Sequence, residues 1–452
     1  MRVELSIPQH FWDLLSAIGG IFYGDIKNQL VTGITTDSRD CIKGDVFFAL
    51  DGNNFDGNDF IPDAIKKGAI PVGRGVKQFG IRVDSGNTAL LSLASFYKNT
   101  LPNLIHTVAI TGSVGKTTTK EFLKVLSGER YKTHATGENF NNDIGASLTV
   151  LSAPRDTEIL ILEFGMNHIG EIRKLSNSFS PDTAVITKIG SAHIGLLGNI
   201  QNIAKAKLEI ISGLRGKLLL PLGESLLETE YPHKHYFSAT VASANTSVLK
   251  NSFGQTELYL NRDLYSIFDF PSSAEHILEC LAASIAASRE IDIDPADITK
   301  GIEKISKNEF RHKVVTSQYG YTIIDDSYNA SYESILAALK MLRDTPLVTR
   351  RFALLGDILE LGDMSYAIHY AIGKAVANYK IDYLFMIGEN AKTVYQGAVH
   401  NGFDKNRAFI LNNLSFPAEV ANFIMDILRE GDTILIKASH KINLESIVKL
   451  IR

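Results

Sequence analysis

The 452-residue chain is poor in several features that would place it in other classes of protein. Its two cysteines, Cys41 and Cys280, lie far apart and outside any CxxC or Cys/His ligand spacing, which favours two reduced thiols over a disulfide framework or a zinc site. No apolar run approaches the roughly 18 residues of a membrane-spanning helix, and residues 1–9 lack a basic stretch followed by an apolar core. The sequence therefore predicts a cytosolic protein without a membrane span.

An excess of positive charge is also missing. Lys and Arg number 46 against 50 for Asp and Glu, so the net charge of −4 provides no broad positive field for nucleic acid or an anionic membrane. The hydrophobic share of 45% and the 12 prolines are ordinary for a globular protein, which excludes a disordered or collagen-like chain. At about 150 residues per domain, the length predicts two or three domains.

Residues 1–100 predict a small α/β domain. Short strand-like stretches at 45–50 and 69–72 accompany a helix at 61–67. We expect this helix to end at Gly68, because glycine favours the left-handed conformation of a C-terminal cap.

A second domain is predicted for residues 101–311. The apolar run 106–110 enters a glycine-bearing turn, and apolar residues then recur at helical spacing from Lys116 to Leu126. Later strand candidates alternate with helical stretches, which is typical of a parallel sheet with crossover helices. Strand-like segments without helices, between Leu218 and Leu260, predict an antiparallel edge. The other candidate elements are strands at 158–162 and 183–189 and helices at 199–213, 273–288 and 295–305.

The most specific local signal is the segment Thr111–Thr118, TGSVGKTT, at a predicted junction from strand to helix. Its glycines would let backbone N–H groups surround phosphate oxygens, Lys116 would reach the β- and γ-phosphates, and Thr117 could ligate Mg²⁺. The general P-loop has a further glycine where this chain has Ile110, so the loop is a shortened variant; an ordinary glycine turn is the alternative reading. The predicted ATP-binding residues here are Gly112, Ser113, Gly115, Lys116, Thr117 and Thr118.

Two further side chains follow predicted strands of this domain. Glu163 ends an apolar run and would lie at the carboxyl edge of the sheet, where it could hold a metal on the phosphates. His193 lies just beyond the strand at 183–189, again at a carboxyl edge. Taken alone, Glu163 could be a solvated strand end and His193 a hydrogen-bonded structural residue.

The alternation of strands and helices restarts after Arg311, which predicts a third domain over residues 312–452 with a doubly wound sheet. Its strand candidates are 321–324, 351–355, 383–387, 408–411 and 433–437. The predicted fold class is therefore α/β with three domains: a small N-terminal α/β domain, a central P-loop-type ATPase domain built on a parallel sheet, and a C-terminal Rossmann-like domain.

Several separated motifs resemble the Mur ligase family of peptidoglycan synthesis, and the resemblance spans nearly the whole chain. The matching segments are 36–39, 44–47 and 55–57 in the first domain, 111–120, 139–145, 163–171, 190–193 and 204–209 in the second, and 325–330 and 355–362 in the third. The resemblance is strongest to those members that join D-Ala-D-Ala to UDP-N-acetylmuramoyl-tripeptide (UDP-MurNAc-tripeptide). It implies these two substrates, no nucleic-acid or membrane partner, and a monomer.

The resemblance also implies a reaction. The γ-phosphate of ATP moves to the terminal carboxylate of the acid substrate, and an amine then attacks the acyl phosphate to give an amide, ADP and phosphate. A carboxylate is a poor electrophile, and phosphorylation turns one of its oxygens into a leaving group while bringing anions together. The implied cofactors are therefore ATP and two Mg²⁺ ions.

By the same resemblance, four residues hold the metals. Thr117 and Glu163 serve the ion at the β- and γ-phosphates, and His193 serves a second ion near the acyl group. Lys207 is implied to be carbamylated, because an ammonium would repel the metal whereas a carbamate is an anion. Without the resemblance, Lys207 would be one solvated charge on the helix at 199–213. The implied catalytic residues are Lys116, His193, Lys207 and Arg311.

The third domain is implied to contact the nucleotide. Arg311 corresponds to a family arginine that reaches across the domain gap to the ATP phosphates, although on its own it could be a surface arginine. Asp325 and Asp326 end a strand where a carboxylate could accept hydrogen bonds from ribose hydroxyls. For one of the two, capping of the helix near Ser331 is the alternative.

Substrate contacts are implied in all three domains. Ser38 and Arg39 resemble part of the nucleotide-sugar module, where arginine suits a diphosphate, with turn formation as the alternative. Asn329 and Ala330 resemble the segment that faces the incoming amine. The implied substrate-binding residues are Ser38, Arg39, Asn141, Asn142, Asn329 and Ala330.

The chain departs from the family pattern at the expected adenine and amine pockets. Glu275, His276 and Glu279 occupy the places of His-Asn and a later Asn, so a carboxylate replaces an amide that both donates and accepts. His440 occupies the place of an arginine, so a titratable group replaces a permanent cation. Tyr332 stands where proline is common.

Two alternatives to the main reading follow from these residues. A Mur-type amide ligase of a specialised pathway would keep residues 111–210 and change the adenine and C-terminal pockets. An inactive nucleotide-binding homologue would be expected to lose the four chemical side chains, all of which are present: Lys116, Glu163, His193 and Lys207. The third residue of the peptide, diaminopimelate or lysine, stays open.

Overall fold

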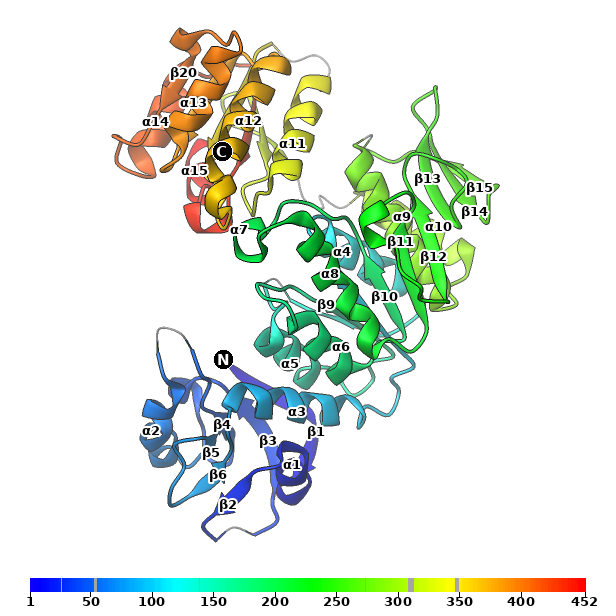
Figure 1. Ribbon diagram of the computed structural model, residues 1–452, viewed down its shortest axis with the longest axis vertical. Helices are drawn as coiled ribbons and strands as arrows, with labels where there is room; N and C mark the ends of the chain where they lie inside the picture. Colours follow the sequence, from blue (N-terminus) through cyan, green and yellow to red (C-terminus); the bar gives the residue numbers. More distant parts are fainter. Residues whose placement is uncertain (26, 53–54, 138, 273, 308–312, 346–348) are drawn as a thin grey trace.

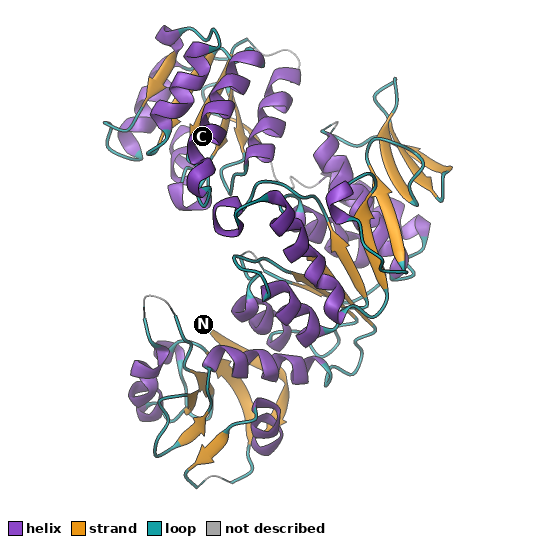
Figure 2. Cartoon of the chain, in the orientation of Figure 1, coloured by secondary structure: helices purple, strands orange, loops and turns teal. Residues whose placement is uncertain are grey.

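A computed structural model describes residues 1–452 except 26, 53–54, 138, 273, 308–312 and 346–348. The described residues form three separate sheets, one in each third of Figure 1, and helices flank the strands of each sheet in Figure 2. This arrangement confirms the predicted class, an α/β protein with three parts. The exact limits, 1–100, 101–311 and 312–452, stay predictions. Among the described residues, no helix is long and apolar enough to cross a membrane.

The first sheet has six strands in the order β1-β3-β4-β5-β6-β2. Helix α2 is followed by Gly68 with a φ of +78°, so the expected glycine stop is confirmed. The sequence pattern gave no expectation for β1, β3 or the two other helices. The strands are β1 Arg2–His10, β2 Ile21–Tyr23, β3 Leu30–Thr35, β4 Val46–Phe48, β5 Ile70–Gly73 and β6 Gly80–Arg82, and the helices are α1 Phe11–Ile18, α2 Ile61–Lys66 and α3 Gly86–Lys98.

The second sheet has nine strands in the order β15-β14-β13-β12-β11-β10-β7-β9-β8. The strands are β7 His106–Thr111, β8 Thr133–Ala135, β9 Ile159–Glu163, β10 Thr183–Ile186, β11 Lys217–Pro221, β12 Lys234–Ser238, β13 Thr246–Lys250, β14 Thr256–Leu260 and β15 Asp263–Phe268. The helices are α4 Lys116–Ser127, α5 Asp143–Leu151, α6 Glu171–Phe179, α7 Ile194–Leu197, α8 Ile200–Leu208, α9 Glu275–Glu290 and α10 Pro295–Lys307.

The expected antiparallel edge between Leu218 and Leu260 is correct only in part. Strand β11 pairs in parallel with β10 and β12, and β12 pairs in parallel with β13. Antiparallel pairing begins between β13 and β14 and continues to β15. The connection from β11 to β12 is long enough for a parallel crossover, yet it contains only the short 3-10 helix Ser225–Leu227. The absence of a helical stretch between strand-like segments was therefore not enough to predict that the strands are antiparallel.

The third sheet has the order β16-β17-β21-β18-β19-β20 and is parallel except for β16. Strand β21 lies between β17 and β18, so the carboxyl ends of β17 and β21 are adjacent. The strands are β16 Lys313–Thr316, β17 Thr322–Asp325, β18 Arg351–Gly356, β19 Tyr383–Ile387, β20 Ala408–Ile410 and β21 Thr433–Lys437, and the helices are α11 Tyr332–Asp344, α12 Ser365–Asn378, α13 Ala391–His400, α14 Ala418–Ile427 and α15 Glu445–Ile451.

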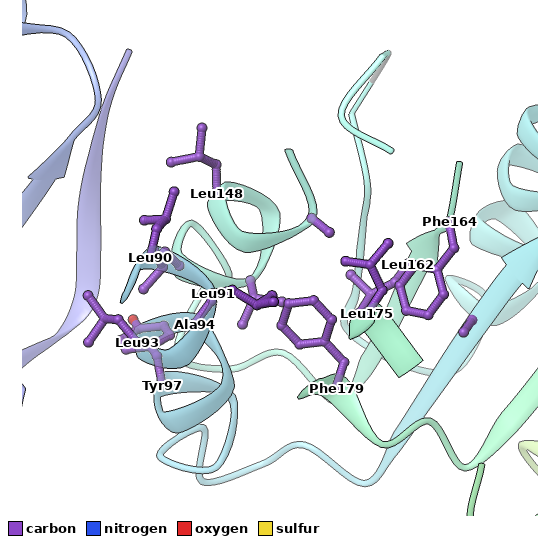
Figure 3. Close-up of a cluster of buried hydrophobic side chains, with 14 of the residues drawn as sticks. Leu90, Leu91, Leu93, Ala94, Tyr97, Leu148, Leu162, Phe164, Leu175 and Phe179 are labelled. Atoms are coloured by element: carbon purple, nitrogen blue, oxygen red, sulfur yellow. The ribbon is translucent and has the colours of Figure 1, made fainter. Parts of the chain in front are cut away.

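The first and second sheets share an apolar interface. Leucines and Tyr97 of α3 pack against buried side chains of α5, β9 and α6 in one continuous core cluster (Figure 3). Polar contacts fix the edge of this interface, because Lys98 donates to the Phe179 carbonyl at 2.6 Å and Ser6 donates to the Ala153 carbonyl at 2.6 Å. The side chains labelled in Figure 3 are Leu90, Leu91, Leu93, Ala94, Tyr97, Leu148, Leu162, Phe164, Leu175 and Phe179.

Candidate active site

The phosphate-loop candidate connects the end of β7 to the start of α4. Gly112 and Gly115 have φ values of +145° and +89°, which L side chains rarely adopt. A Cβ on Gly112 would overlap Oγ1 of Thr187, so the loop needs a glycine there for space as well as for conformation. The loop is thus an open turn of backbone that leads directly into a helix N-terminus, as the sequence predicted.

Hydrogen bonds to the segment that follows β10 hold this turn. Thr187 donates from Oγ1 to the Val114 carbonyl at 2.6 Å. Ser113 donates from its backbone nitrogen to the Lys188 carbonyl at 2.7 Å and from Oγ to the Gly190 carbonyl at 3.1 Å. Movement of the segment 187–190 would therefore move the phosphate-loop candidate with it.

Lys116 begins helix α4, and its ammonium bonds to the loop itself. Nζ donates to the Gly112 carbonyl at 2.8 Å. Lys116, Thr117 and Thr118 line one pocket, and Thr118 is buried. The charge of Lys116 therefore lies against the backbone of the loop.

Glu163 is the last residue of β9 and is only 4% exposed. Nδ2 of Asn141 donates to its Oε1 at 3.1 Å, so the amide orients the carboxylate. The neighbouring Asn142 is used differently: its Oδ1 accepts from the backbone nitrogen of Gly145 at 2.8 Å and caps α5. Of the two predicted substrate-binding asparagines, Asn141 lines the pocket and Asn142 has a structural contact.

His193 precedes α7 with a left-handed backbone, at a φ of +65°. Its Nδ1 lies 2.7 Å from Oε2 of Glu360, which belongs to the third domain. Burial lowers the pKa of His193, and the positive charge of Lys116 lowers this pKa further, while Glu360 acts in the opposite direction. The neutral imidazole, the form that ligates a metal, is therefore favoured.

Lys207 lies on α8 and is 1% exposed. Among the described residues its Nζ has no hydrogen-bond partner. Burial places the pKa of Lys207 well below the ordinary lysine value; Lys116 lowers it too, and Glu163 and Glu171 oppose the shift. The solvated surface reading is wrong for this lysine, which is a buried amine close enough to Lys116 and Glu163 to respond to their charges.

The carboxyl ends of β17 and β21 form the opposite wall of the pocket. Nζ of Lys437 contacts the Asp326 carboxylate and donates to the Asn329 carbonyl at 2.8 Å. Oδ1 of Asp325 accepts from the backbone and Oγ of Ser327 at 3.1 and 2.6 Å. Ser331 caps the N-terminus of α11, so the alternative that Asp325 or Asp326 caps this helix is wrong.

One pocket collects most of the predicted side chains. Those that line it are Ser113, Gly115, Lys116, Thr117, Thr118, Asn141, Glu163, His193, Asp326, Asn329 and Ala330. Lys207 is buried and is not among the lining residues, and Arg311 is outside the described residues. Ser38 and Arg39 lie in the first domain, where Ser38 is buried and the exposed Arg39 pairs with Asp37.

Two of the departures from the family pattern, His276 and Glu279, line this pocket from α9, whereas Glu275, Tyr332 and His440 are not among its lining residues. Cys280 of the same helix also lines it, with its thiol 3.6 Å from the Gly115 carbonyl. Burial raises the pKa of Glu279, while Lys188, whose Nζ lies 3.8 Å from Oε2, opposes the shift. The carboxyl group of Glu279 therefore retains its proton to higher pH than an exposed glutamate.

The donor set suits magnesium bound with a polyphosphate. Across the part of the chain that the structure describes, no three His, Cys, Asp or Glu side chains form a ready-made metal cage. Mg²⁺ commonly uses one or two carboxylates and takes its remaining ligands from phosphates and water. Glu163 and Thr117 satisfy that requirement, and the orphaned amine of Lys207 fits conversion to a carbamate.

Three family models match consecutive parts of the chain. They describe the Mur ligase family catalytic domain at residues 30–73, the Mur ligase middle domain at 110–286 and the Mur ligase glutamate ligase domain at 310–440. The fold and the pocket thus define a nucleotide-dependent ligase of three domains.

Whole-length relatives agree with these models. A UDP-N-acetylmuramoyl-tripeptide--D-alanyl-D-alanine ligase of Bacillus subtilis is 35% identical over 94% of this chain and 93% of its own. MurF of Acinetobacter baumannii superposes with a TM-score of 0.87 at 26% identity over 99% of both chains. MurF of Thermotoga maritima, solved in complex with ADP, has a TM-score of 0.78 at 26% identity over 92% of this chain and 96% of its own. The protein belongs to the Mur ligase family of ATP-dependent peptide ligases.

Proposed function

We propose that this ligase joins D-Ala-D-Ala to UDP-MurNAc-tripeptide, with conversion of ATP to ADP and phosphate, in the synthesis of peptidoglycan precursor. The observation that carries the proposal is the convergence of Lys116, Glu163 and His193 on one pocket that Asn329 of the third domain also lines. The B. subtilis relative, named for this reaction, matches nearly the whole chain.

The phosphate loop binds the triphosphate of ATP in this proposal. The backbone N–H groups between Gly112 and Thr118 and the N-terminus of α4 face anionic oxygens. Lys116 has a flexible stem, so its ammonium can turn from the Gly112 carbonyl to the β- and γ-phosphates when nucleotide binds. The site thereby supplies positive charge where the γ-phosphate leaves.

Thr117 and Glu163 would hold one Mg²⁺, and His193 with a carbamylated Lys207 would hold the second. The ions, when bound, neutralise the crowded anions of triphosphate and carboxylate. Asn141 keeps the Glu163 carboxylate oriented, and burial keeps His193 neutral. The chain's own contribution is a fixed set of oxygen and nitrogen donors on the pocket wall.

Carbamylation of Lys207 follows from its burial. Only a neutral amine attacks carbon dioxide, and the depressed pKa of Lys207 raises the share of that form. The amine nitrogen forms a bond to the carbon of CO₂ and loses one proton, which leaves an anionic carbamate. The cost of burying this anion is offset by a bound cation, which explains why the group suits a metal site.

Chemistry then proceeds at the acid substrate. One oxygen of its terminal carboxylate attacks the γ-phosphorus, ADP leaves, and an acyl phosphate forms. The dipeptide amine, on the side of Asn329 and Ala330, attacks the acyl carbon, loses a proton and expels phosphate. The phosphate group carries away the oxygen that came from the carboxylate.

The remaining roles belong to binding. Ser38 and Arg39 are proposed for the diphosphate of the nucleotide sugar, and Asn142 for the substrate next to Asn141. Asp325 and Asp326 are proposed for the ribose, and Arg311 for the phosphates across the domain gap. In support of a binding role, the Asp326 carboxylate lies in the pocket, where the ammonium of Lys437 contacts it.

A second candidate function is a Mur-type amide ligase with a different acid or amine substrate. It is favoured by Glu279 in the pocket beside the phosphate loop and by His440, whose ring lies 5.6 Å from that of Tyr328, a pocket residue. Both residues depart from the family pattern at positions that would touch substrate.

ADP release tests the proposal and separates it from this alternative. Purified protein is incubated with ATP, Mg²⁺ and UDP-MurNAc-tripeptide, with and without D-Ala-D-Ala, and ADP is measured by a coupled assay. Release that requires both substrates supports the proposal. Release with another acid or amine, and none with these two, supports the alternative. ATP binding without turnover on any pair would mean an inactive homologue.

A further inference from the structure

The segment 190–195 carries His193 and includes the first two residues of α7; we call it loop 190–195. The third domain holds its first end. Oε1 of Glu333, in the first turn of α11, accepts from the backbone nitrogen of Ser191 at 2.8 Å. Oε2 of the same carboxylate accepts from Oγ of Ser191 at 3.1 Å. A single carboxylate therefore binds the backbone and the side chain of one loop residue.

The other end of the loop is held by the segment after β18. The carbonyl of Glu360 accepts from the backbone nitrogen of Gly195 at 3.0 Å, while its carboxylate lies 2.7 Å from Nδ1 of His193. A Cβ on Gly195 would lie 2.6 Å from that carbonyl, so the close approach of these two segments needs a glycine at position 195. Ile194 packs against core clusters of both the second and the third domain.

Both partners of the closest contact have unusual backbone conformations. His193 and Glu360 have φ values of +65° and +64°, in the left-handed region that residues other than glycine rarely adopt. Such conformations persist where the surroundings over-determine them. Here the surroundings of each residue include the other domain.

The same loop is tied to the phosphate loop. Ser113 donates to the carbonyls of Lys188 and Gly190 at 2.7 and 3.1 Å. Loop 190–195 is therefore connected on one side to the nucleotide site and on the other to two carboxylates of the third domain.

We propose that Glu333 and Glu360 are positioning residues, which hold loop 190–195 so that His193 reaches its metal-binding geometry only while the third domain is docked. The metal at His193 rests on the proposed function, whereas the contacts that hold the loop do not. Neither carboxylate needs to touch substrate, because each acts through the loop.

Manganese binding provides the test, since Mn²⁺ replaces Mg²⁺ and is visible by electron paramagnetic resonance. The full chain, with a non-hydrolysable ATP analogue, is titrated with Mn²⁺ for the wild type and for Glu333→Ala, Glu360→Gln and the double variant. For the weakest Mn²⁺ site that the titration resolves, we expect a dissociation constant at least 10-fold higher in the double variant than in the wild type. Affinity for the analogue without metal should stay within 2-fold, because the phosphate loop is unchanged.

Two control variants separate positioning from general effects. Glu430→Gln removes an exposed carboxylate from the same domain. Glu430 precedes β21, at the amino end of that strand, whereas the pocket lies at its carboxyl end. This variant should bind Mn²⁺ as the wild type does. Glu333→Gln keeps an acceptor for the Ser191 nitrogen and should retain most of the affinity that Glu333→Ala loses. Thermal unfolding within about 2 °C of the wild type would show that each variant is folded.

Wild-type Mn²⁺ affinity in a folded double variant would overturn the proposal. So would an equal loss in Glu430→Gln, because charge alone would then explain it. Failure of the wild type to release ADP with both substrates would instead refute the proposed function, and the Mn²⁺ titration would still report on the loop.

Discussion

Asn141 donates from Nδ2 to Oε1 of Glu163 at 3.1 Å, and both side chains line the pocket beside the phosphate loop. The contact joins the segment before α5 to the end of β9, so two separate motifs orient one carboxylate. We predict that Asn141→Leu leaves the fold intact and raises the Mg²⁺ concentration for half-maximal ADP release about 10-fold, the equivalent of one lost hydrogen bond to a charged group. A Mg²⁺ titration of the turnover rate measures this, and an unchanged requirement would remove Asn141 from the metal site.

A methyl group on the phosphate loop should weaken the binding of ATP. Gly112→Ala places a Cβ against Oγ1 of Thr187 at a φ of +145°, which must displace the loop. We predict a loss of ATP affinity of at least 10-fold by isothermal titration calorimetry. Gly223→Ala is a matched control, because Gly223 also has a positive φ, of +87°, but a Cβ there meets no atom within 4 Å.

Lys116→Ala should abolish ADP release, because the γ-phosphate then loses its cation during transfer. The expected loss in kcat is at least 10³-fold, measured by the same coupled assay. Lys205→Ala, a lysine on α8 two positions before Lys207 and exposed, is the control and should keep the wild-type rate. A comparable loss in both variants would point to a general effect of net charge.

Lys207→Ala should leave ATP binding within about 3-fold while ADP release stops, because the substitution leaves the phosphate loop and Lys116 in place but removes a buried amine that supplies a metal ligand in our proposal. Short carboxylates such as acetate or propionate should restore part of the activity, since they can take the place of the carbamate. Restoration by chloride at equal ionic strength would contradict the carbamate, as would wild-type turnover in the variant without any added acid.

Lys98 makes the stability of the interface between the first and second domains depend on pH. Burial lowers the pKa of Lys98 to about 8, with Asp182 opposing the shift and Arg215 adding to it. The unfolded chain therefore holds more protons at this lysine between about pH 8 and 10.5, so the wild type gains stability relative to Lys98→Met as the pH rises through that window. The gain approaches about 3 kcal/mol, and urea unfolding at pH 7.5 and 10 measures it. A constant difference between the two proteins would contradict the assignment.

Local pattern was enough to predict the chemical core of the pocket. The phosphate loop and Glu163 follow apolar runs that become the adjacent parallel strands β7 and β9, so the rule that carboxyl ends meet at one sheet edge brought them together. Lys437 obeys the same rule at the end of β21 and could have been found by it. Glu333 and Glu360 carried no such signal, because their partners lie in another domain.

The first sheet shows a different reason for incomplete prediction. In β1, Val3, Leu5 and Ile7 alternate with polar residues, but Pro8, a residue disfavoured inside strands, ends the pattern, and the register with β3 shifts between Glu4 and Gln9. Helix α3 buries residues on most of its surface, because it packs against both its own sheet and the second domain. Its apolar face was therefore too wide to appear as a simple amphipathic pattern.

The transfer of a carboxylate oxygen to phosphate tests the whole scheme most directly. UDP-MurNAc-tripeptide labelled with ¹⁸O in both oxygens of its terminal carboxylate is incubated with ATP, Mg²⁺ and D-Ala-D-Ala, and the released phosphate is analysed by mass spectrometry. An acyl phosphate formed in the pocket of Lys116, Glu163 and His193 predicts one ¹⁸O in each phosphate released. Phosphate without ¹⁸O, released during formation of the amide, would contradict this mechanism.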